Sequence, residues 1–114
     1  MDSQYSITTL TDATFGNEVI QSEDLILVVF EAEWSGSCHI LSPTMDALAA
    51  ELSDSARVCR LDVDRSPSVS REYGISTLPT ILFFQGGKVV DVLVGALPRD
   101  EIESRIASHV QIGE

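Results

Sequence analysis

Apolar runs alternate along the chain with segments in which apolar positions recur every three or four residues. Leu25–Phe30 holds six apolar residues in succession, which is typical of a strand buried on both faces in a parallel sheet. Thr80–Gln85 and Lys88–Val94 are two further strand candidates, and Gly86-Gly87 between them suits a tight hairpin turn. The pattern also predicts shorter strands over Tyr5–Leu10 and Arg57–Val63.

Helical spacing predicts helices between these strands. The longest should run from about Ser37 to Leu52, with a kink at Pro43, because its apolar positions repeat at three and four: Ile40, Leu41, Met45, Leu48, Ala49 and Leu52. A short helix is expected earlier in the chain, where the same spacing joins Phe15, Val19 and Ile20.

Two more helices are predicted in the second half of the chain. One should begin at Ser66-Pro67, where a capping side chain precedes a proline at the first helical position, and should end before Gly74. Pro98 should open the last helix, whose inner stripe is Ile102, Ile106 and Val110. The order βαβαβαββα predicts an α/β fold, with a mixed central sheet and helices on both faces, and 114 residues suit a single domain over 1–114.

Charge narrows the classes of partner. Seven basic and eighteen acidic residues give a formal net charge of −11, which repels phosphate backbones and anionic lipid and so argues against nucleic acid and membrane surfaces. The same charge favours a basic partner, or simply keeps the protein soluble. No apolar tract approaches the ~18 residues of a membrane span, and the N-terminus lacks a basic, apolar leader, so we expect a cytoplasmic protein.

The two cysteines, Cys38 and Cys59, are too few for a disulfide scaffold, and no paired Cys/His ligands stand at zinc spacing. We therefore expect no metal and no cofactor. Cys59 on the third predicted strand is expected to be a small core residue. A Cys38–Cys59 disulfide is disfavoured because such bonds need close and specific Cβ geometry.

Several short motifs, spread over nearly the whole chain, together resemble those of a known family. The motifs are Ala32-Glu33-Trp34-x-Gly-x-Cys38, Pro43, Leu61-Asp62-Val63-Asp64, Tyr73-Gly74-Ile75, Thr77-Leu78-Pro79-Thr80 and Val94-Gly95-Ala96-Leu97. In this order and spacing the chain resembles thioredoxin. The resemblance implies the thioredoxin fold, thiol–disulfide redox chemistry, and a cis peptide bond before Pro79 in a loop that pairs with an extended substrate peptide.

Thioredoxins use Trp-Cys-Gly-Pro-Cys, whose first cysteine attacks and whose second resolves the mixed disulfide. In this chain Ser35 stands at the attacking position and Cys38 at the resolving position. A serine hydroxyl cannot exchange with a disulfide, so dithiol cycling is excluded for the chain as written. Cys38 lies in the first turn of a predicted helix, where the amide dipoles favour a thiolate, but this position is normally partly shielded in the family.

Other positions near the motif also differ from the usual thioredoxin residues. Val29 stands where thioredoxins usually place a buried Asp that takes the proton of the resolving thiol, and valine cannot do so. Glu31 stands where an aromatic residue often lies, and Arg60 matches a position that is usually lysine. Ser37 replaces the motif's proline, which leaves a further potential helix cap.

The recognition surface of the family has counterparts in this chain. The resemblance assigns substrate binding to a set of seven residues, namely Trp34, Gly36, Ser37, Thr77, Leu78, Pro79 and Gly95. An exposed tryptophan beside a backbone that can pair with an extended peptide is a plausible hot spot. Pro79 and Gly95 also fit an alternative in which the backbone geometry alone requires them.

Three functions remain open on the sequence. The first is an atypical oxidoreductase that acts through Cys38 alone, with an external thiol resolving the mixed disulfide. The second is a redox-inactive adaptor or chaperone that holds a protein or peptide client, possibly basic, beside Pro79. The third is an ordinary thioredoxin with an engineered Ser35, which leaves Val29 unexplained.

Overall fold

The computed structural model describes residues 7–52 and 55–110, and these form a five-stranded sheet with the strand order β1-β3-β2-β4-β5. β1 and β2 each pair in parallel with β3, whereas β4 pairs antiparallel with both β2 and β5. The strand bounds are β1 Thr8–Leu10, β2 Ile26–Glu31, β3 Arg57–Asp62, β4 Thr80–Gln85 and β5 Lys88–Val94.

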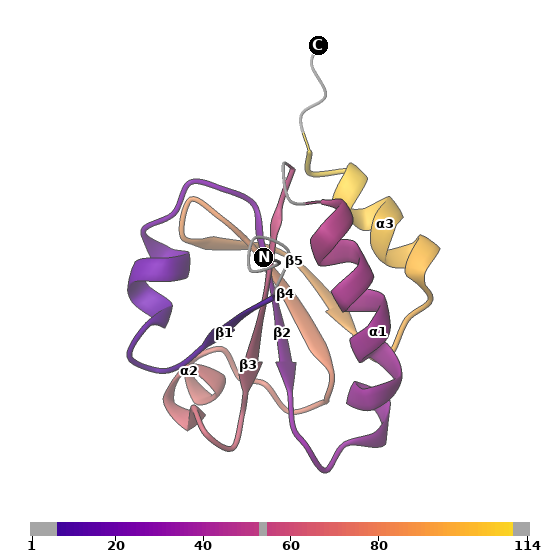
Figure 1. The fold of residues 1–114 in the computed structure, drawn as a ribbon. Coiled ribbons are helices and arrows are strands. Elements are labelled where there is room, and N and C mark those ends of the chain that lie inside the picture. The colour runs from indigo at the N-terminus through magenta and orange to yellow at the C-terminus, as the bar shows by residue number, and fades with distance from the viewer. Residues whose placement is uncertain (1–6, 53–54, 111–114) are drawn as a thin grey trace.

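Helices cover both faces of this sheet (Figure 1). On one face α1 (Gly36–Glu51) and α3 (Arg99–Ala107) enclose a core with Leu27 and Val29 of β2. On the other face lie η2 (Gly16–Ile20), a single π-helical turn, and α2 (Pro67–Glu72), which pack on a second core. None of the helices in the described ranges has the length and apolar character needed to cross a membrane.

The α/β thioredoxin fold predicted from the sequence is confirmed, and the bounds of β4 and β5 agree with the prediction. The first strand is shorter than predicted, and Tyr5 and Ser6 lie outside the described residues. Ile40, one of the apolar positions whose spacing predicted α1, does not face the core: it is 72% exposed, whereas Cys38 and Leu41 turn inward. α1 includes Pro43, and the kink there stays a prediction.

The cap of α2 also differs from the prediction. Ser66 does precede a proline in the first turn, but its side chain is buried and makes no capping bond. Asp12, from the loop after β1, accepts hydrogen bonds from the backbone N–H groups of Val69 (2.9 Å) and Ser68 (3.2 Å). A carboxylate here also offsets the positive end of the helix dipole. The cap therefore comes from a residue distant in sequence.

The β4–β5 hairpin turn provides a matched pair of glycines. Gly86 and Gly87 both have positive φ, +61° and +78°, but only Gly87 is crowded, since a Cβ there would lie 2.6 Å from the backbone oxygen of Ile20. Gly86→Ala should cost about 1–2 kcal/mol of unfolding free energy through its backbone conformation alone. Gly87→Ala should cost roughly 3 kcal/mol or more, because backbone atoms must also move. Urea unfolding of the two variants tests this, and equal costs would contradict the close approach.

Candidate functional site

The candidate site forms where β2 ends and α1 begins. Ser35 is the N-cap of α1, with extended backbone angles (φ −91°, ψ 115°), and its hydroxyl oxygen accepts a hydrogen bond from the Cys38 backbone N–H at 3.3 Å. The suggestion that Ser37 serves as a cap is wrong, because Ser37 already lies inside the helix and its side chain is exposed. A serine at the N-cap satisfies one of the free N–H groups of the first turn.

Cys38 lies in the first turn of α1 with only 4% of its surface exposed, so its thiol is buried. Cys59 is fully buried on β3, and burial raises the pKa of its thiol to about 11. Both cysteines are free thiols, so no disulfide joins them. Val29 lies in the core that α1 covers, among apolar side chains, and gives this part of the site no proton acceptor.

Trp34 projects from the segment between β2 and α1, with 71% of its side chain exposed. Its indole N–H donates a hydrogen bond of 2.7 Å to Oδ2 of Asp64. Asp64 belongs to the turn after β3, where Oδ1 of Asp62 accepts hydrogen bonds from the backbone N–H groups of Asp64 and Arg65 at 2.8 and 3.2 Å. The exposed ring is therefore held in position by a turn that is itself fixed.

A groove of about 470 Å³ lies beside this ring, and we call it the Trp34 groove. Its lining consists of residues from the start of α1 and from the loops after β3 and α2, namely Trp34, Ser35, Val63, Ile75, Ser76, Thr77 and Leu78. The adjoining Leu78–Pro79 peptide bond is cis, as the resemblance implies. Gly95 donates its backbone N–H to the Pro79 carbonyl oxygen at 2.8 Å, so Gly95 also lies at this edge.

The structure thus brings only some of the predicted binding residues together. Trp34, Thr77 and Leu78 line the groove, whereas Pro79 and Gly95 lie next to it. Gly36 and Ser37 are exposed at the start of α1 and do not line the groove. Cys38 does not line it either.

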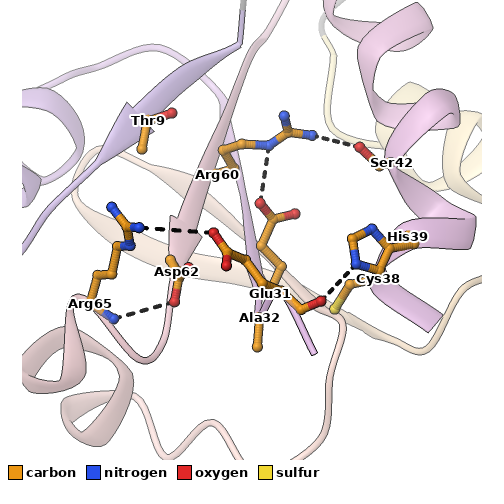
Figure 2. Close-up of a pocket in the computed structure, with 10 residues that line it drawn as sticks. Thr9, Glu31, Ala32, Cys38, His39, Ser42, Arg60, Asp62 and Arg65 are labelled. Carbon is orange, nitrogen blue, oxygen red and sulfur yellow. Dashed lines mark hydrogen bonds and ion pairs between the residues drawn. The ribbon is translucent and has the colours of Figure 1, made fainter. Parts of the chain in front are cut away.

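Cys38 instead lines a second cavity of about 370 Å³, which we call the rear pocket (Figure 2). Its walls come from β1, the ends of β2 and β3, and the first turns of α1: Thr9, Glu31, Ala32, Glu33, Cys38, His39, Ser42, Arg60, Asp62 and Arg65. The rear pocket and the Trp34 groove share no lining residue.

Charged groups dominate the rear pocket. Arg60 Nε lies 3.2 Å from Glu31 Oε2, and the Arg60 guanidinium donates a hydrogen bond to Ser42 Oγ at 3.1 Å (Figure 2). Burial raises the pKa of the Glu31 carboxyl group, and the nearby Arg60 charge acts in the opposite direction. His39 Nε2 lies 2.7 Å from the Glu33 carbonyl oxygen, so the first turn of α1 is tied back to the preceding loop.

The sequence drew attention to Glu31 and Arg60 but did not assign Thr9, Ser42, Asp62 or Arg65 to a site. One signal was available for Asp62. The carboxyl ends of neighbouring parallel strands meet at one edge of a sheet, and Glu31 and Asp62 end two such strands. They are direct partners in the β2–β3 register.

Comparison with known proteins agrees with this architecture. The thioredoxin family model matches residues 6–108. The chain is 38% identical over 105 residues to a thioredoxin of Porphyra purpurea, covering 92% of this chain and 98% of that protein. It is 41% identical over 100 residues to a thioredoxin of Chlorobaculum thiosulfatiphilum, covering 88% and 93%. The chain therefore belongs to the thioredoxin family of redox proteins.

Within the described ranges, no group of three or more His, Cys, Asp or Glu side chains lies close enough together to hold a metal ion. The groups present can cap a helix, present an aromatic ring and hold one thiol beside an ionic cluster.

The Trp34–Asp64 hydrogen bond predicts a measurable protection. In Asp64→Ala the indole N–H loses its acceptor, so its exchange with solvent should become several-fold faster, as followed by NMR. Asp100→Ala removes another exposed carboxylate, in helix α3, and should leave this exchange unchanged. Equal exchange in Asp64→Ala and the unmodified protein would show that Asp64 does not hold the ring.

Proposed function

We propose that this thioredoxin-family protein binds extended peptide or protein clients in the Trp34 groove without cycling a dithiol. The observation that carries the proposal is the contrast between two parts of one helix start. Trp34 is exposed and held by Asp64, whereas Cys38 is buried and the Ser35 hydroxyl caps the helix. The site therefore presents a binding surface more openly than a nucleophile.

The recognition geometry supports this proposal. An aromatic ring beside an apolar groove is a typical anchor for a partner, and the backbone next to cis-Pro79 lies at the groove's edge. Catalysis by two thiols needs one sulfur that attacks the substrate disulfide and a base that takes the proton of the second, resolving thiol. Ser35 supplies no sulfur, and Val29 supplies no base.

Charge favours a basic client. The formal net charge is −11, and carboxylates lie close to the exposed ring: Asp64 binds the indole, and Glu33 precedes it in the chain. Such a field raises the association rate of cationic partners and opposes nucleic acid and anionic membranes. We also propose a cytoplasmic location, where free thiols persist.

A second candidate function is thiol–disulfide exchange through Cys38 alone, with an external thiol as the resolving group. One observation favours it: Cys38 is among the residues that line the rear pocket, despite its low exposure. It also lies in the first turn of α1, where the amide dipoles stabilise a thiolate.

Absence of dithiol cycling predicts that the protein will not accelerate the reduction of insulin disulfides by dithiothreitol above background. Ser35→Cys restores both sulfurs and should give at best a sluggish reductase, because Val29 still withholds a proton acceptor. The double variant Ser35→Cys/Val29→Asp should then be faster than Ser35→Cys alone. Turnover by the unmodified protein at the rate of a thioredoxin would refute the proposal.

Client binding predicts a loss of affinity on removing the ring. Calorimetric titration with an extended Lys-rich peptide should show Trp34→Ala binding about tenfold or more weakly, because hot-spot truncations cost about 2 kcal/mol. Ile40→Ala removes a side chain of similar exposure (72% against 71%) from the helix α1 and should bind normally. A Glu-rich peptide of equal length should bind more weakly. Equal losses in both variants would argue against the Trp34 groove.

A further inference from the structure

We propose that the rear pocket binds small zwitterionic disulfides of the amino-acid type, and that Cys38 forms a mixed disulfide with one half of the bound molecule. This inference rests on the second candidate function, exchange through Cys38, and assigns it a class of substrate. It does not depend on client binding in the Trp34 groove, because the two cavities share no lining residue.

The charges of the pocket favour a ligand that carries both signs. Cationic side chains come from Arg60 and Arg65, and carboxylates come from Glu31, Glu33 and Asp62. Figure 2 shows Arg60 beside Ser42 on one side of the pocket and Arg65 on the other, where the Arg65 backbone N–H donates to Asp62 Oδ1. The Arg65 guanidinium lies 3.9 Å from Oε2 of Glu33, and both of these side chains are largely exposed. A simple anion would be repelled by the net charge of −11, and a simple cation would leave the arginines without a partner from the ligand.

Arg60 is the proposed contact for the ligand's carboxylate. Its Nε is fully buried and faces Glu31 Oε2 at 3.2 Å, so the terminal nitrogens of the guanidinium are the atoms that would contact the ligand. Its contact with Asp46 is long, 3.5 Å, and the Asp46 side chain is 60% exposed, so this ion pair is weak. A guanidinium that Ser42 holds in place can accept a carboxylate at little cost in side-chain entropy.

The ammonium group of the ligand would lie against the ends of β2 and β3. Asp62 uses Oδ1 for two backbone N–H groups, and within the described ranges its Oδ2 makes no hydrogen bond. Glu31 is its direct partner across the parallel strands. Two neighbouring carboxylates are well suited to an ammonium group, and a pocket of about 370 Å³ is large enough for a ligand of this size.

The chemical step is an exchange between sulfurs. The Cys38 thiol loses its proton to water, and the thiolate attacks one sulfur of the ligand's disulfide. The bond between Cys38 and that sulfur forms as the ligand's S–S bond breaks. The other half leaves as a thiolate and takes a proton from water. The ligand is thereby reduced to one free thiol, and Cys38 is oxidised to the mixed disulfide.

Three small disulfides separate charge from reactivity: cystine carries both charges, cystamine only ammonium groups, and dithiodiglycolate only carboxylates. The rate of adduct formation on the native protein is followed by intact mass, and peptide mapping distinguishes Cys38 from Cys59. We expect cystine to react at Cys38 about tenfold faster than either singly charged compound. Cys38→Ser should give no adduct at that position.

Charge-matched variants test the assignment. Arg60→Gln should slow the cystine reaction about tenfold and leave the cystamine rate unchanged or higher. Arg65→Gln, at a side chain that is 79% exposed, provides a second test that does not disturb the core and should also slow cystine selectively. Arg71→Gln removes the same charge from the exposed side of α2 and should change no rate.

The outcomes distinguish selection of zwitterions by the rear pocket from thiol–disulfide exchange through Cys38. If Cys38 reacts with all three compounds at similar rates, or fastest with cystamine, the rear pocket does not select zwitterions and the inference is overturned. If no disulfide modifies Cys38, exchange through this thiol is overturned as well. Client binding in the Trp34 groove would stand in either case, because its test uses peptide affinity.

Discussion

Burial of β2 on both faces is the constraint on which the rest of the structure depends. Ile26 and Val28 belong to the core under η2 and α2, while Leu27 and Val29 belong to the core under α1 and α3. No residue from Ile26 to Phe30 is more than 2% exposed. A carboxylate between Ile26 and Phe30 would have to be desolvated at a cost of several kcal/mol. Valine at position 29 therefore strengthens the packing at the position where proton transfer would need a polar group.

The end of β2 also positions the candidate functional site. Because β2 lies between β3 and β4, its end is surrounded by the turn after β3 and by the loop at cis-Pro79. Consecutive residues after β2 then serve separate cavities: Trp34 and Ser35 line the groove, and Cys38, one helical turn later, lines the rear pocket. The proposed client groove and the remaining thiol are thus separated in space within five residues of chain.

The sequence was sufficient for features that depend on local pattern. Six apolar residues in succession identified the buried strand at Leu25–Phe30, and the Gly86-Gly87 pair identified the hairpin turn. It was insufficient where a partner comes from elsewhere in the chain. Asp12 caps α2 in place of Ser66, and Asp64 binds Trp34, because tertiary contacts bring these carboxylates to the N–H groups. The rear pocket was missed for the same reason, since it combines side chains from four elements.

Serine at position 35 affects how readily this site could regain a second thiol. A cysteine sulfur is a weak hydrogen-bond acceptor, whereas the serine hydroxyl accepts from the Cys38 backbone N–H and secures the helix start. Exchange of sulfur for oxygen at this position removes a reactive atom, and a serine N-cap stabilises a helix by roughly 1 kcal/mol relative to alanine. A cysteine here would accept that hydrogen bond more weakly and would restore at best a sluggish activity, since Val29 would still be in place. Recovery of dithiol chemistry would therefore need changes at both positions 35 and 29, whereas changes around the exposed Trp34 ring would need neither.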